Sequence, residues 1–356
     1  MKHDSDIEQL RSRLTASPAL YPFAVDLPAD RIRFVPLTLA EYAGASFLDE
    51  RLGIPDADGS WCPWDEVSQA IAGLPEQCHF IFHISHVGST LLSRLLGQHS
   101  ALFSLREPAV LRNLADIHLA LGRAPCPWSP PIFDVRLGVC LGLWSRTFLT
   151  GQTAVIKATS FVSEMAGHLM ARVRDSRSIL MYVPPLTFLK VLLDGAIKDI
   201  SRAAGKRLFR LHRRLGGEQW RLQDFSVGEQ VAMSWLSEML ALHASGRQFP
   251  ERSLWIDFDQ FLTAPEPCLI GALRHFAAAD AETIAREILS GPTLSQYSKA
   301  PERKYDSGLR DRLLKRGEER HAAEIRKGMD WLERAAAIPV VREVLELSTR
   351  RTGIRG

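Results

Sequence analysis

Short apolar runs alternate with helical periodicity over residues 77–290 of this chain. The runs have the length and continuity of strands buried on both faces of a parallel sheet, and they cover 79–84, 102–105, 153–157, 177–183 and 253–257. Apolar residues recur at helical spacing in the segments between them: 88–98, 108–122, 133–148, 161–173, 186–203, 226–246 and 266–277. This alternation predicts an α/β fold in three layers, a parallel sheet with helices on both faces.

The segments on either side of this core have a different character. Residues 1–76 are expected to form an N-terminal extension packed on the core, helical at 5–15 and then interrupted by prolines. Residues 291–356 are expected to contain a basic loop, up to about 307, and C-terminal helices that belong to the same domain as the core.

Composition narrows the class of protein. Of the 356 residues, 46% are hydrophobic and 24% charged, as in ordinary globular domains, and a formal net charge of +3 is too small to indicate nucleic-acid binding. No stretch reaches the ~18 uninterrupted apolar residues of a membrane span, and the charged N-terminus lacks the apolar core of a signal peptide. The five cysteines are dispersed without metal-ligand spacing, which indicates reduced thiols and a cytoplasmic protein.

The most informative local motif follows the first strand of the core. Gly88, Ser89 and Thr90 lie between that strand and a helix whose leucines recur at helical spacing. A strand, a tight turn and a helix in this order favour a phosphate-binding loop, because the helix N-terminus presents free N–H groups and a positive dipole to an anion. As a nucleotide-binding loop of the Walker type the motif is incomplete, since Ser89 occupies the position of the lysine and His83 that of the first glycine.

Several segments in the same order resemble the PAPS-dependent sulfotransferase family, whose co-substrate is 3′-phosphoadenosine 5′-phosphosulfate (PAPS). The loop from His83 to Leu92 resembles the first loop of that family, and Gln98-His99-Ser100 followed by Arg106-Glu107-Pro108 resembles its continuation. Val155–Thr159 resembles the family's second strand with its lysine, and Ile256–Phe261 resembles a late strand-to-helix element. The chain is therefore similar to a divergent, bacterial-type member with a P-loop fold.

The resemblance implies a function and a set of site residues. The implied reaction transfers a sulfonate group from PAPS to a hydroxyl or amine of a small molecule or peptide, leaves 3′-phosphoadenosine 5′-phosphate (PAP), and needs no metal. Backbone and side chains of Val87, Gly88, Ser89, Thr90 and Leu91 would hold the phosphosulfate. His86, in the position of the family's loop cation, and Lys157 would stabilise the transferring group. Glu107 is the first candidate for the base, with His83 and His86 as competitors.

The ligands of the 3′-phosphate depart from the family pattern. Val183 and Val191 occupy the positions of the family's arginine and serine, and Lys190 is a candidate substitute. Two downstream segments also offer cations, Arg202–Arg214 and a late basic loop that contains Lys299, Arg303 and Lys304.

Two other functions remain open from the sequence. An atypical ATP- or GTP-dependent kinase would use magnesium at Asp257 or Asp259, and a degenerate loop would bind a nucleotide or a partner without chemistry. Structural roles also remain open: Glu107 as a complement to a helix dipole, Gly88–Thr90 as a helix cap, Lys157 as a strand-end charge and His83 as a core histidine. The acceptor and the oligomeric state are not encoded in any short motif.

Overall fold

The computed structural model describes residues 2–195, 197–217, 220–297, 300–304 and 307–349. At its centre is a parallel sheet of five strands in the order β5-β6-β4-β7-β8. The strands are β4 (Cys78–His83), β5 (Leu102–Arg106), β6 (Thr153–Lys157), β7 (Ser178–Tyr182) and β8 (Ser253–Asp257). Every strand coincides with one of the predicted apolar runs to within one residue at either end, and the predicted α/β fold class is confirmed.

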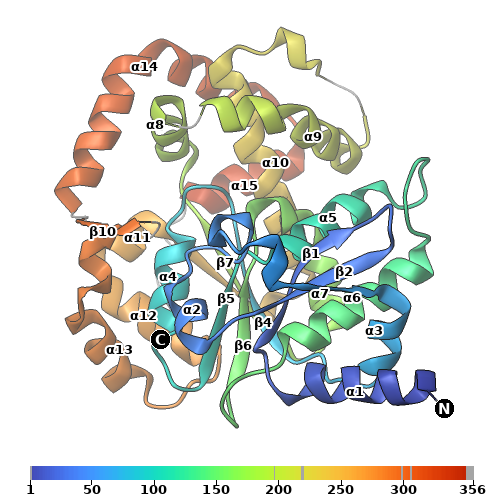
Figure 1. The fold of residues 1–356 in the computed structure, drawn as a ribbon. Helices are drawn as coiled ribbons and strands as arrows, with labels where there is room; N and C mark the ends of the chain where they lie inside the picture. The colour runs from blue at the N-terminus through green and yellow to red at the C-terminus, as the bar shows by residue number, and fades with distance from the viewer. Residues whose placement is uncertain (1, 196, 218–219, 298–299, 305–306, 350–356) are drawn as a thin grey trace.

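Helices cover both faces of this sheet (Figure 1). α4 (Ser89–Leu96) packs with α12 (Pro265–His275), whereas α7 (Ala166–Arg172) and the 3-10 helix η3 (Ser160–Met165) pack with α10 (Val227–Gln248). The chain crosses from β4 to β5 in one direction and from β6 to β7 in the other. Because parallel crossovers are right-handed, these two connections lie on opposite faces of the sheet.

The remaining core helices are α5 (Ala109–Ala120), α6 (Pro130–Trp144), α8 (Pro185–Gly195), α9 (Ile197–Leu215) and α11 (Phe258–Thr263), with short 3-10 turns η4 (Leu222–Asp224) and η5 (Pro250–Arg252). The helix predicted over 186–203 corresponds to α8 and α9, which lie on either side of residue 196, outside the described residues, and α9 continues past the predicted end to Leu215. The arginine-rich part of α9 is not a solvated face, because Arg207 and Arg210 are each only 3% exposed.

The N-terminal extension contains a sheet that the sequence did not predict. β1 (Leu20–Asp26), β2 (Arg31–Pro36) and β3 (Ser60–Pro63) pair antiparallel in that order. Pro22 lies at a shift of register between β1 and β2, where a strand tolerates proline, and such prolines hid the strands from a reading of periodicity. The helical elements of this region are α1 (Lys2–Ala16), α2 (Leu39–Gly44), α3 (Trp64–Ala70), η1 (Glu50–Leu52) and η2 (Asp56–Asp58).

The C-terminal part is mainly helical, as predicted, and it packs on helices of the core. It comprises α13 (Ala281–Ser290), η6 (Pro292–Ser295), β9 (Gln296–Tyr297), β10 (Ala300–Lys304), α14 (Ser307–Ala335) and α15 (Pro339–Thr349). α14 is kinked at His321, whose backbone is not helical, and it packs on α8 and α10. In the described part of the chain, no helix combines the length and the apolar character needed to cross a membrane.

Candidate anion-binding and catalytic site

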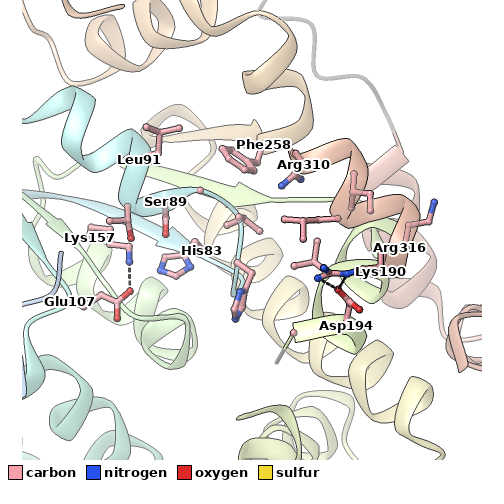
Figure 2. A pocket seen from close by; sticks show the side chains of 18 residues that line it. His83, Ser89, Leu91, Glu107, Lys157, Lys190, Asp194, Phe258, Arg310 and Arg316 are labelled. Atoms are coloured by element: carbon pink, nitrogen blue, oxygen red, sulfur yellow. Dashed lines mark hydrogen bonds and ion pairs between the residues drawn. The ribbon is translucent and has the colours of Figure 1, made fainter. Parts of the chain in front are cut away.

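The carboxyl ends of β4, β5 and β6 meet at one edge of the sheet. The parallel register sets Lys157 beside Ile81 of β4 and beside Arg106 of β5, so the residues that follow these strands lie close together. Here His83, Glu107 and Lys157 line a cavity of about 300 Å³ (Figure 2). Its other lining residues are His86–Leu91 from the loop, Lys190, Val191, Asp194 and Gly195 from α8, Phe258, and Arg310, Leu313, Leu314 and Arg316 from α14.

The loop between β4 and α4 has a backbone suited to an anion. Gly88 is the N-cap of α4 with φ of 65°, and no side-chain hydrogen bond caps the helix. A Cβ atom at this position would lie 1.9 Å from the Phe258 ring, so both conformation and space require glycine. Ser89 and Thr90 are buried at the start of the helix, and Thr90 Oγ1 has no hydrogen-bond partner among the described residues. The helix N-terminus therefore faces the cavity with its donors free for a ligand.

Glu107 and Lys157 form an ion pair in the cavity wall. The Lys157 ammonium, on a side chain only 1% exposed, contacts Glu107 Oε1, and Arg51 Nη2 lies 3.6 Å from Glu107 Oε2. The backbone of Glu107 has φ of 52° and its N–H donates to the Lys157 carbonyl at 2.7 Å, which turns the side chain towards β6. Burial raises the pKa of Glu107, but the positive charges of Lys157 and Arg51 outweigh burial and lower it. The carboxylate is therefore ionised at neutral pH and able to accept a proton.

His83 lies in the same wall as a neutral side chain. Its Nδ1 lies 2.7 Å from the carbonyl oxygen of Ile84. Because a carbonyl oxygen only accepts, Nδ1 carries the proton and donates it, and Nε2 is left with a lone pair. Nε2 is buried and has no partner among the described residues. Burial, reinforced by the Lys157 charge, lowers the pKa of His83 to about 3.

As the pH is lowered, the protein is expected to lose stability already at pH values well above the pKa of its carboxylates. Burial lowers the pKa of His79 and His118 to about 4 and that of His83 to about 3. Below pH ~6.5 the unfolded chain binds protons at these histidines and the folded chain does not, so stability falls as pH falls. Asp257, whose pKa burial raises to about 6, acts in the opposite direction, but it is a single group, whereas burial also lowers the pKa of His168, His243 and His275.

The measurement is the urea midpoint at pH 7, 6 and 5. A His118→Gln variant is the control, because it removes one titrating group remote from the cavity and should flatten the dependence. Equal midpoints for the wild type at pH 7 and pH 5 would contradict the expectation.

The far end of the cavity carries cations that the sequence did not single out. Arg310 contacts Asp259 and lies with its guanidinium 4.9 Å from the centre of the Phe258 ring. Arg316 Nε donates to Asp194 Oδ2 at 2.8 Å. Both arginines lie on α14, more than 200 residues after the anion-binding loop, where they form part of an evenly charged helix, so no local signal distinguished them.

The other predicted phosphate ligands fall in different places. Lys190 lines the cavity and pairs with Glu318 at 2.8 Å. Lys299 is outside the described residues, and Arg303 and Lys304 lie on β10, whose side chains are not described. Of the arginines in segment 202–214, Arg207, Arg210 and Arg214 pair with carboxylates behind the loop, and none of the three lines the cavity.

The residues expected of a kinase are engaged in other contacts. Asp257 caps α11 by accepting from the Asp259 N–H at 2.9 Å. Asp259 accepts from Thr187 Oγ1 at 2.9 Å and contacts Arg310. Neither lines the cavity, and the described residues contain no cluster of three or more His, Cys, Asp or Glu side chains that would hold a metal ion.

Comparisons with known proteins give low similarity. No protein-family model matches this chain, and no curated protein matches it. Among solved structures, it is similar to the sulfotransferase domain from the curacin biosynthetic pathway, with 14% identity over 69% of this chain and 97% of that chain and a TM-score of 0.39. It is also similar to a sulfotransferase from Mycobacterium tuberculosis, with 12% identity over 89% of this chain and 98% of that chain and a TM-score of 0.39. At this level of similarity, the function rests on the site.

Proposed function

We propose that this protein transfers a sulfonate group from PAPS to a hydroxyl or amine of a small-molecule or peptide acceptor. The observation that carries the proposal is the uncapped N-terminus of α4 in the same cavity as the buried Lys157–Glu107 pair. The helix terminus suits an anionic donor, and the pair combines a cation with an ionised base. Sulfonyl transfer needs both groups and no metal.

Each residue of the cavity has a separate role in the proposed reaction. N–H groups of Val87–Leu91 hold the phosphosulfate, and Lys157 stabilises charge on the bridging oxygen. The acceptor's oxygen or nitrogen forms a bond to sulfur while the bond from sulfur to the phosphate oxygen breaks, which leaves PAP. Glu107 takes the proton that the acceptor loses. His86 is exposed at the rim of the cavity and adds positive charge there when protonated.

The far end of the cavity suits the second phosphate of this donor. Lys190, Arg310 and Arg316 are brought together there by α8 and α14, whereas Val183, at the family's arginine position, is buried. Each of the three cations has a carboxylate partner, so we propose that the 3′-phosphate replaces one of these carboxylates when it binds.

Thermal stability with three ligands tests the proposal. PAP without metal is expected to raise the unfolding temperature by several degrees, since a ligand at 100 times its Kd stabilises the native state by about 2.7 kcal/mol. ATP–Mg²⁺ and GTP–Mg²⁺ are the matched controls. Stabilisation only by a magnesium nucleotide would contradict the proposal and indicate a kinase. No response to any of the three ligands would favour a non-catalytic protein.

A further inference from the structure

Behind the anion-binding loop lies a buried network of charged side chains. Glu238 of α10 is completely buried and accepts from Arg207 Nε at 3.1 Å and from Arg210 Nη1 at 3.2 Å. Glu164 accepts from Arg210 Nε at 3.3 Å and from Arg214 Nη2 at 2.7 Å. Three guanidinium groups therefore face two carboxylates, and the network retains one positive charge.

Arg207 is the member of this network that reaches the loop. Its Nη2 donates to Ser85 Oγ at 3.4 Å, and Ser85 Oγ lies 3.0 Å from Ser160 Oγ at the start of η3. Its Nη1 is enclosed in protein and has no hydrogen-bond partner among the described residues. A buried guanidinium N–H without an acceptor is costly, so its retention points to a role beyond pairing with Glu238.

The loop needs support at this point. Ser85 directly precedes His86, a non-glycine residue with φ of 60°, and Gly88 has φ of 65°. A non-glycine residue in this region persists only where its surroundings hold it. The loop also has neither lysine nor arginine between Ile84 and Leu91, so it lacks a permanent charge of its own.

We propose that Arg207 is a positioning residue of the anion-binding loop. It holds Ser85 in place and supplies, from α9, the permanent positive charge that the loop lacks. A charge in the protein interior is screened far less than one at the surface, so it acts on an anion without touching it. This inference rests on the proposed function only in taking the loop as the site of a phosphate or sulfonate group.

Matched substitutions of Arg207 and Arg210 test the inference. Arg207→Met and Arg210→Met each remove one buried guanidinium from Glu238 and each leave two cations for two carboxylates, but only the first cuts the link to Ser85. PAP binding by calorimetry is expected to weaken about tenfold in Arg207→Met, equivalent to 1.4 kcal/mol, and at most twofold to threefold in Arg210→Met. Arg207→Lys is expected to recover part of the loss, because it restores the charge.

Two further measurements separate the role of Arg207 from a loss of folding and from the identity of the donor. If Arg207→Met does not fold, Ser85→Ala cuts the same link from the loop side and is expected to weaken PAP binding by a smaller factor. Inorganic pyrophosphate is the second probe: a wild type that binds pyrophosphate but not PAP would remove the proposed donor, while leaving Arg207 testable with pyrophosphate. A wild type that binds neither probe removes the role of the loop and this inference with it. Equal affinities of the wild type and Arg207→Met, or equal losses in both methionine variants, would overturn the role of Arg207.

Discussion

Glu107→Gln is expected to reduce sulfonate transfer by about 10²–10⁴-fold, the range that a positioned general base contributes. The same substitution is expected to cost about 3–5 kcal/mol of stability, because it leaves the Lys157 ammonium, on a side chain only 1% exposed, without its carboxylate. Transfer from labelled PAPS measures the first effect, and the urea midpoint measures the second. Full activity in Glu107→Gln would remove Glu107 as the base.

A double variant separates these two effects. Glu107→Gln with Lys157→Met removes both charges of the pair, and the replacement of a buried ion pair by neutral groups is often close to neutral for stability. We therefore expect the double variant to recover most of the lost stability and none of the lost activity. Recovery of both would show that the pair is only structural, with the base elsewhere in the cavity.

Gly88→Ala is expected to be the most damaging single change in the loop. Alanine at φ of 65° costs about 1–2 kcal/mol, and its Cβ would lie 1.9 Å from the ring of Phe258, which is only 5% exposed. Displacing that ring adds about 1–3 kcal/mol of overpacking and moves a residue that lines the cavity. Both the unfolding temperature and the response to PAP should fall.

Gly205→Ala is the matched control for this substitution. Gly205 lies within α9, and a Cβ atom there would meet no atom within 4 Å. Alanine at such a position is expected to stabilise the helix by about 0.5–1 kcal/mol. A Gly88→Ala protein that is as stable as wild type and binds PAP equally well would show that the loop does not require its left-handed turn.

The strands and the loop were predictable because their signals are local. Each strand of the parallel sheet is a short apolar run, since burial on both faces leaves no polar alternation. Gly88 followed by Ser89 and Thr90 indicated the strand-to-helix turn, because few residues adopt its backbone conformation. The antiparallel sheet of the extension was missed, because prolines such as Pro22 interrupt its pattern. α9 continues to Leu215, past the predicted end at residue 203, and its Arg207 and Arg210 are buried rather than solvated.

The cavity itself combines predicted and unpredicted residues. His83, Glu107, Lys157 and Lys190 were all singled out from the sequence, and they line it together. The contact between Glu107 and Lys157 was not predicted, because it depends on the register of β5 against β6. Arg310 and Arg316 line the cavity because α14 packs on α8, which brings together residues over 100 positions apart in the sequence.

The sequence by itself therefore determined the order of strands and helices, the turn at Gly88 and the residue types at the ends of the central strands. Only the tertiary structure decided which charges meet. It paired Lys157 with Glu107 and placed Arg207 behind the loop. The physical reason is that backbone conformation and burial are governed by neighbours in the chain, whereas the energy of a charge depends on every group near it in space.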